Sequence, residues 1–246
     1  ETGMTGAKGL KPGILEGEIL LNLDTEEDDE IGVGCAGGID ITATRTYAMI
    51  NTEESQSAFE IVVKGLTGGH SGMDIHKGLG NANKIMNRIL YDGFSNFELR
   101  ISEIDGGGLL NAIPRESRAI ILIGSKFQDR FITEMSGMIS VIKNELKTME
   151  PGLNIEIKPV AKPEHYMESD VQELLMKALY SACNGVYRMS PDIPDLVGTS
   201  NNIARVEIKE GHIKILCLTR SSVDSSKTDL ANSLKCTFEL MGCDVE

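Results

Sequence analysis

The order of the strands and helices that the sequence predicts is the feature that most restricts the fold. Apolar segments of strand character and amphipathic segments of helical spacing follow one another as strand, helix, strand, strand, helix, strand, and this order occurs twice. It is the split βαβ order of ferredoxin-like sheets. The sequence therefore predicts an α+β fold: two consecutive ferredoxin-like βαββαβ units that form an extended antiparallel sheet with helices on one face.

Two segments carry the clearest helical pattern. In residues 79–93 the apolar positions recur at helical spacing, and the pattern stops at Gly93. Residues 128–149 place a continuous apolar stripe on one face of a helix, formed by Phe131, Met135, Met138, Ile142, Leu146 and Met149. Two further helices are expected at 170–183 and 227–242.

The segments between these helices are rich in β-branched and apolar residues and are bounded by turn residues, as strands are. The expected strands are 42–51 paired with 57–66, then 97–107, 118–125, 153–160, a hairpin at 200–220 that turns at KEGH, and a last strand from 243. The strand at 153–160 is expected to open the second unit. The units are therefore predicted at about 42–151 and 152–246, after a small α/β segment at 1–41.

Composition excludes several classes of partner. The net charge is −13, so neither nucleic acid nor an anionic membrane surface is an expected partner. No apolar stretch approaches the ~20 residues that span a bilayer. The five cysteines include no C-x-x-C pair, and reduced thiols in a cytoplasmic protein are the expected interpretation.

Three glycines surround His70 in TGGHSG at 67–72, directly after a predicted strand. Glycine at this density serves tight turns or a close approach of the backbone to another group. A histidine on such a loop can donate to a carbonyl oxygen or to a developing oxyanion. A simple turn at the end of a strand explains the pattern equally well, and the residues alone leave both interpretations open.

Four more polar residues occupy positions where ligands are commonly bound. Asn111 lies on a turn before Pro114, and Arg220 ends an apolar strand, where a guanidinium group can bind a carboxylate through two hydrogen bonds. Glu1 and Asp24 are hard-ligand positions for a divalent metal, with Asp24 at the end of the apolar run 17–24. Their spacing alone does not distinguish these residues from ordinary turn and surface residues.

Taken in order, several runs resemble one family. ETGMTGA, ILLNLDTEEDDEIGVGCAGGID, GLTGGHSGMDIHKGLGNANK, NAIPRE, GTSNN and CLTRSS are similar to the corresponding runs of the aminoacyl-histidine dipeptidases. These enzymes are co-catalytic zinc metallopeptidases related to carnosinase and aminoacylase. The resemblance covers essentially the whole chain, and runs 21–40 and 65–84 favour the dipeptidase branch.

This resemblance implies a zinc-binding catalytic domain with a lid domain inserted in its middle. Residues 1–41 then correspond to part of the catalytic domain and 42–246 to the lid. Glu1 and Asp24 match metal ligands of a site for two Zn²⁺, while His70 matches the lid histidine that stabilises the tetrahedral intermediate. Asn111 and Arg220 match residues that bind the substrate backbone and its terminal carboxylate.

The family's H-x-D motif, bridging Asp, base Glu and last His ligand are absent from these 246 residues. Two ligands without a bridging carboxylate do not hold a two-metal centre. We therefore expect an internal fragment dominated by the lid, which by itself is inactive and binds zinc poorly. The parent protein is expected to hydrolyse Xaa-His-type and other dipeptides with metal-activated water, and a homodimer is compatible with this expectation.

Two alternatives remain at this stage. A non-catalytic oligomerisation or regulatory module would use the same paired ferredoxin-like units without any metal site. Within the wider family, a tripeptidase or an N-acyl amino acid amidohydrolase would use the same chemistry on another substrate.

Overall fold

The computed structural model describes residues 6, 9–19, 21 and 35–246. The chain divides into two compact parts, Glu1–Cys35 and Ala36–Glu246, and the elements given below belong to the second part. Glu1, Asp24 and half of the strand expected at 17–24 lie outside the described residues. None of the described helices has the length and apolar character needed to cross a membrane.

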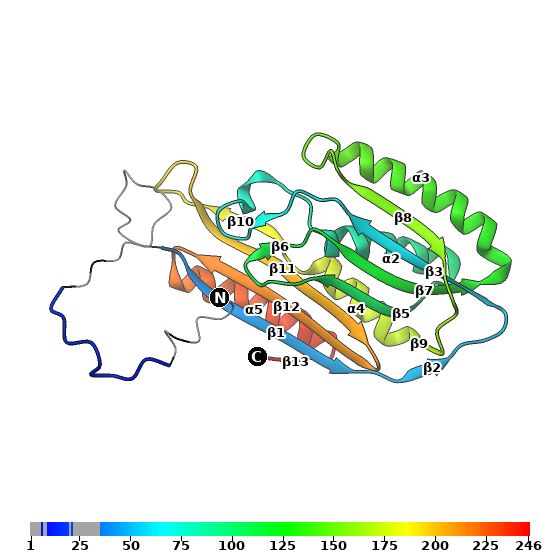
Figure 1. Cartoon of the computed structure of the whole chain (residues 1–246), viewed down its shortest axis with the longest axis horizontal. Coiled ribbons are helices and arrows are strands. Elements are labelled where there is room, and N and C mark those ends of the chain that lie inside the picture. The colour runs from blue at the N-terminus through cyan, green and yellow to red at the C-terminus, as the bar shows by residue number, and fades with distance from the viewer. Residues whose placement is uncertain (1–5, 7–8, 20, 22–34) are drawn as a thin grey trace. The chain divides into compact units, whose positions relative to one another are not determined.

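The first ferredoxin-like unit comprises β3 (Gln56–Lys64), α2 (Ala82–Phe97), β5 (Arg100–Gly107), β7 (Ser117–Gly124), α3 (Gln128–Leu146) and β8 (Asn154–Pro159). Its strands lie in the order β5-β7-β3-β8, and neighbouring strands are antiparallel (Figure 1). Helix α2 begins after Asn81, whose side chain accepts from the N–H groups of Asn83 and Lys84. This cap satisfies two donors that have no partner within the helix.

The second unit comprises β1 (Gly37–Thr46), α4 (Ser169–Ser181), β11 (Val197–Lys209), β12 (His212–Ser221), α5 (Asp224–Leu240) and β13 (Asp244–Val245). Its strands lie in the order β13-β1-β12-β11, again antiparallel. The hairpin between β11 and β12 turns at Glu210 and Gly211, which both have positive φ values, 50° and 79°. Two consecutive positive φ values are typical of the tight turns that suit the twist of a hairpin.

Two ferredoxin-like units in one antiparallel sheet are thus confirmed, but the strands are distributed differently from the expectation. Strand β1 pairs with β12 and β13, not with the segment at 57–66. The strand expected to open the second unit is β8, and it pairs with β3 of the first unit. The first unit is therefore inserted between β1 and the rest of the second unit. Local periodicity shows that a segment is a strand, but it does not identify the strand's partner.

Shorter elements complete the fold. Strand β10 (Gly185–Met189) pairs with β11, and two small two-stranded sheets form from β2 (Met49–Asn51) with β9 (His165–Met167) and from β4 (Gly69–His70) with β6 (Ala112–Ile113). In the described part of the chain there are two 3₁₀ helices, η1 (Ile75–Lys77) and η2 (Ser125–Phe127).

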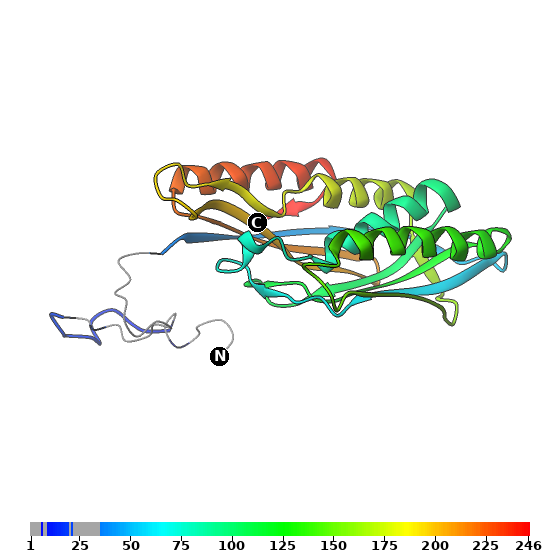
Figure 2. The same ribbon diagram turned by 90° about the horizontal axis from the view of Figure 1, so that it is seen from above.

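The two units meet where β5 pairs with β11 in antiparallel register, from Arg205 opposite Gly107 to Ile208 opposite Ile104. Each unit contributes its second strand to this junction, so the four helices α2, α3, α4 and α5 cover the same face of one continuous sheet (Figure 2). Apolar side chains from both units form the core beneath the helices.

Gln172 of α4 connects the two units on the face of the sheet that the helices cover. Its side chain is fully buried, and its carboxamide accepts from the N–H of Ile101 and donates to the carbonyl oxygen of Leu99, both at 2.8 Å. The register of β5 against β7 shifts between Ile101 and Glu103. The carboxamide therefore pairs backbone groups near the start of β5, a part of that strand with which β11 does not pair.

We predict that Gln172→Met lowers the free energy of unfolding by about 2–4 kcal/mol, because methionine has a similar shape but leaves two buried backbone groups unpaired. Urea unfolding followed by circular dichroism measures this loss. The control is Gln128→Met, the same change at an exposed helical position. Equal midpoints for the two variants would contradict the assigned role of the carboxamide.

Candidate functional site

The segment 67–80 carries His70 and leaves the sheet between β3 and α2. It is anchored by the short β4–β6 pairing, which places His70 opposite Ala112. Within the segment, the carboxylate of Asp74 accepts from the His70 N–H at 2.7 Å, and the Asp74 N–H donates to the His70 carbonyl. The ammonium group of Lys77 and, to a smaller extent, the His70 N–H hold the pKa of Asp74 below its ordinary value.

The imidazole ring of His70 is oriented by backbone donors. Its Nδ1 accepts from the N–H groups of Gly72 and Met73, at 3.2 and 3.1 Å. A nitrogen that accepts hydrogen bonds carries no proton, so the neutral form of this ring carries its proton on Nε2. The half-buried His70 thus presents an Nε2–H donor that a substrate carbonyl or an oxyanion can accept from.

Arg220 lies beside this histidine. A Cβ atom placed on Gly72 would lie 3.3 Å from both His70 Nδ1 and Arg220 Cδ. The two side chains therefore approach the same point from β4 and from the end of β12. Gly72 leaves that point free of a side chain, which explains a glycine two residues after the histidine.

The guanidinium group of Arg220 has a buried donor. Its Nε atom has no hydrogen-bond partner among the described residues. Ser200 of β11 lies directly opposite Arg220, so the two residues share one face of the sheet. A buried donor without a partner is costly, and a bound carboxylate would satisfy Nε together with a terminal nitrogen.

Asn111 lies on the turn before β6, and its side chain is exposed. Its carbonyl oxygen accepts from the N–H of Ser71 at 2.8 Å, which joins this turn to the residue after His70. The structure therefore brings His70, Asn111 and Arg220 into one region, although they come from three separate segments of the chain.

A buried asparagine that the sequence interpretation did not single out holds the Asn111 turn. The fully buried amide of Asn202 donates to the carbonyls of Leu110 and Ala112, at 3.2 and 2.8 Å. These are the residues on either side of Asn111. The run GTSNN was part of the resemblance, but the sequence contains no signal that one of its amides reaches a turn about 90 residues away.

Asn202 itself lies in a gap along one edge of β11. Strand β10 pairs with residues up to Asn201, and β5 pairs from Arg205 onward. Between them the carbonyl of Ile203 accepts from the side chains of Asn81 and Asn83, and the N–H of Ile203 donates to Asn184. The side-chain amides take the place of a neighbouring strand.

The same side-chain amides connect the two units. Asn81 caps α2 with its oxygen and donates through its nitrogen to Asn184, which follows α4. Lys84, on the first turn of α2, donates to three carbonyls at the end of α4, those of Leu179, Tyr180 and Ala182. Burial lowers the pKa of Lys84, and a charge at a helix C-terminus interacts favourably with the carbonyls there.

Metal ligands are not gathered in this region. Across the described part of the chain, no group of three or more His, Cys, Asp or Glu side chains is placed to hold a metal ion. The two metal ligands expected from the resemblance, Glu1 and Asp24, lie outside the described residues. The described part of the chain thus contributes polar and cationic groups to the candidate site, and no complete metal centre.

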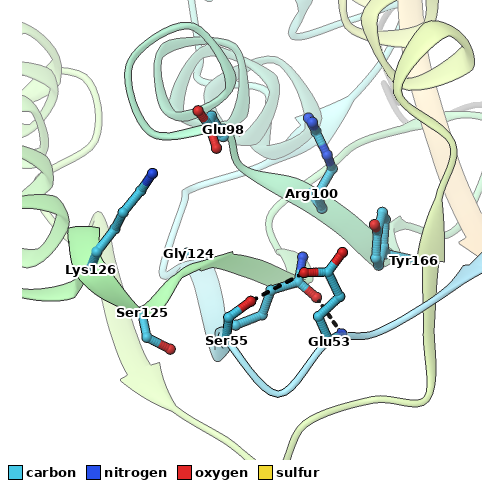
Figure 3. A pocket seen from close by; sticks show the side chains of 9 residues that line it. Glu53, Ser55, Glu98, Arg100, Gly124, Ser125, Lys126 and Tyr166 are labelled. Carbon is cyan, nitrogen blue, oxygen red and sulfur yellow. Dashed lines mark hydrogen bonds between the residues drawn. The ribbon is translucent and has the colours of Figure 1, made fainter.

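A cavity of about 440 Å³ lies elsewhere (Figure 3), lined by residues near β2 and β9, whose place in the fold is seen in Figure 1. Figure 3 shows Lys126, Arg100, Glu98 and Tyr166 around it, with Glu53 bound to Ser55. Four of these residues are exposed, namely Lys126, Glu98, Glu53 and Ser55. None of the residues expected to act on a substrate lines this cavity.

Comparison with known proteins agrees with the expected family. Residues 61–150 match the peptidase dimerisation domain family. The chain is 36% identical over its whole length to the cytosol non-specific dipeptidase of Escherichia coli (strain K12) and covers 51% of that protein. The chain is also similar to the crystal structure of aminoacylhistidine dipeptidase from Vibrio alginolyticus, with a TM-score of 0.89 and 37% sequence identity. This match covers all of the present chain and 50% of the Vibrio chain. The chain thus spans about half the length of these relatives.

We predict that the ¹⁵N chemical shifts of the neutral His70 ring show an unprotonated Nδ1 and a protonated Nε2, because two backbone N–H groups donate to Nδ1. Two-dimensional NMR spectra that correlate ring nitrogens with ring protons distinguish the tautomers. The exposed His76 of the same segment is the internal control and should show no preference for one tautomer. A protonated Nδ1 in the neutral His70 ring would contradict the geometry.

Proposed function

We propose that this chain is the lid-bearing half of a metal-dependent dipeptidase of the aminoacyl-histidine dipeptidase family. The observation that carries the proposal is the convergence of His70 and Arg220 on Gly72, within a chain that resembles two dipeptidases along its entire length. A donor for an oxyanion and a cation for a carboxylate are the groups that a free-carboxylate peptide requires from a lid.

In this proposal Arg220 binds the carboxylate at the end of the dipeptide. The Arg220 side chain lies next to the histidine ring, and Arg220 is opposite Ser200 on the neighbouring strand β11. A short substrate can therefore reach both the guanidinium group and the histidine ring. A longer peptide would have to place another residue where the carboxylate is bound. This requirement favours dipeptides over longer substrates.

His70 then donates its Nε2–H to the scissile carbonyl oxygen as that oxygen gains negative charge. The two backbone donors on Nδ1 hold the ring in the required tautomer before substrate arrives. Asn111, exposed on the adjoining turn, would donate its amide to the substrate backbone. The three groups bind and orient the substrate and stabilise charge in the transition state.

The activated water would come from a metal centre, for which we propose two Zn²⁺ with Glu1 and Asp24 among the ligands. The described residues do not form such a centre, so the remaining ligands would have to come from sequence that the relatives contain and this chain does not. We also propose a cytosolic location, on the name of the Escherichia coli relative, and a homodimer, on the match to a dimerisation domain.

The decisive experiment is an assay of the longer protein that contains this chain, with Xaa-His and other dipeptides. We expect hydrolysis that is lost after chelation and restored by Zn²⁺. The 246-residue chain alone should show no turnover under the same conditions. Failure of the longer protein to hydrolyse any dipeptide, with the metal present, would favour the non-catalytic oligomerisation module.

We predict that Arg220→Ala in the longer protein lowers kcat/KM for a dipeptide roughly 10–100-fold, chiefly through KM, because a charge-assisted bond to the substrate carboxylate is lost. The same dipeptide with an amidated C-terminus should show a much smaller change. Steady-state kinetics on the two substrates measures the difference.

Arg130→Ala is the matched control, because Arg130 is an exposed arginine of α3 whose partner is Glu134 on the same helix. An exposed pair of this kind contributes little. If Arg220→Ala affected acid and amide substrates equally, the guanidinium group would not be recognising the carboxylate.

A further inference from the structure

A single buried carboxylate joins the two ends of the segment that carries His70. One oxygen of Glu150 accepts from the N–H of Thr67 at 2.6 Å, and the other accepts from the N–H of Gly80 at 2.7 Å. Thr67 and Gly80 are the first and last residues of the segment 67–80. We propose that Glu150 is a positioning residue that closes this segment and thereby fixes the place of His70; the catalytic part of this inference rests on the proposed function.

The turn after α3 brings the carboxylate to this position. The Glu150 N–H donates to the carbonyl of Leu146 at the end of the helix, and the Glu150 carbonyl accepts from Leu153 just before β8. The backbone on the other side approaches closely, because a Cβ on Gly65 would lie 2.2 Å from the carbonyl oxygen of Gly152. Gly65 also has a φ of +77°, which favours glycine.

The environment makes the two hydrogen bonds significant. Glu150 is only 2% exposed, and no ion pair with a cationic side chain is recorded for it within the described residues. A buried carboxylate must be stabilised by hydrogen bonds, and both bonds here are short, as bonds to ionised acceptors are. The charge is balanced by backbone N–H dipoles, which are available only when both ends of the segment are in place.

The segment between these ends is ordered by its own contacts. Asp74 binds the His70 N–H, and the Gly72 and Met73 N–H groups bind the imidazole ring. These bonds define the shape of the segment but do not attach it to the rest of the unit. The β4–β6 pairing and the Ser71–Asn111 hydrogen bond attach its middle to the turn at Asn111. Glu150 attaches both ends, so its loss would free the ends and let the position of His70 relative to Arg220 vary.

Glu150→Gln separates this role from general stability. The glutamine side chain has a similar shape but only one acceptor oxygen, and its NH₂ group would face one of the two backbone N–H donors. Glu145→Gln is the matched control, because Glu145 is an exposed glutamate near the end of α3, paired with Arg88.

The first measurement is amide hydrogen exchange of the 246-residue chain, residue by residue, by NMR. With Glu150→Gln we expect exchange within 67–80 to rise at least about tenfold, with Thr67 and Gly80 included, while amides in β7 and β12 keep their rates. Glu145→Gln should leave both groups unchanged. Unchanged exchange in 67–80 would overturn the proposal, and so would an equal rise throughout the sheet, which indicates loss of overall stability.

Glu150→Asp provides a second variant if the glutamine variant does not fold. It keeps the charge but is one methylene shorter, so it can bind one of the two amides and not both. We expect a rise in exchange confined to 67–80 for this variant also. Failure of both variants to fold would assign Glu150 to overall stability and would overturn the positioning role.

The second measurement uses the longer protein. Because His70 acts on the developing oxyanion while Arg220 binds the carboxylate, Glu150→Gln should lower kcat about 10-fold or more and change KM about twofold at most. Equal loss in both parameters would contradict the positioning role. If the unmodified protein hydrolyses no dipeptide, the proposed function fails, whereas the exchange experiment still tests the closure of the segment.

Discussion

The side-chain amides that fill the gap along β11 are the interaction on which the candidate site depends. A sheet edge with unpaired backbone groups is unfavourable in a protein interior, and here Asn81, Asn83 and Asn184 pair the backbone of Ile203 where no strand does. The gap has a use, because it allows Asn202 to support the turn that carries Asn111. The same amides tie α2 of the first unit to β11 and the end of α4 in the second. The site region and the junction between the units therefore share one polar network.

The insertion of one ferredoxin-like unit into the other has a consequence for the site. Strand β1 pairs with β12 along its whole length, so the end of β12 that carries Arg220 is fixed between β1 and β11. The inserted unit supplies the segment 67–80 and the turn at Asn111. His70 and Arg220 thus come from different units, and the β5–β11 junction sets their separation. Groups attached to a rigid sheet keep their relative positions better than groups on independent loops.

Much of the fold could be predicted because its signals are local. The stripe from Phe131 to Ile142 marks α3, and the KEGH turn marks the β11–β12 hairpin. The pairing of β1 with β12 and of β8 with β3 could not be predicted, because alternation along a strand does not identify its neighbour. The residues of the candidate site were chosen with the help of the family resemblance, and their roles remain proposals. Glu150 and Gln172 gave no signal, because a glutamate in a turn and a glutamine on a helix are ordinary surface residues until their burial is known.

The sequence by itself determined the class of fold, the number of ferredoxin-like units and the family that the chain resembles. These follow from periodicity, turn residues and motifs, each of which is contained in a short stretch of chain. Only the tertiary structure decided which strand completes which unit, that His70 and Arg220 converge on Gly72, and that one carboxylate holds both ends of the His70 segment. Each of these depends on contacts between residues that are far apart in the chain. Such contacts form because buried donors and acceptors must be paired in three dimensions, a requirement that no local pattern records.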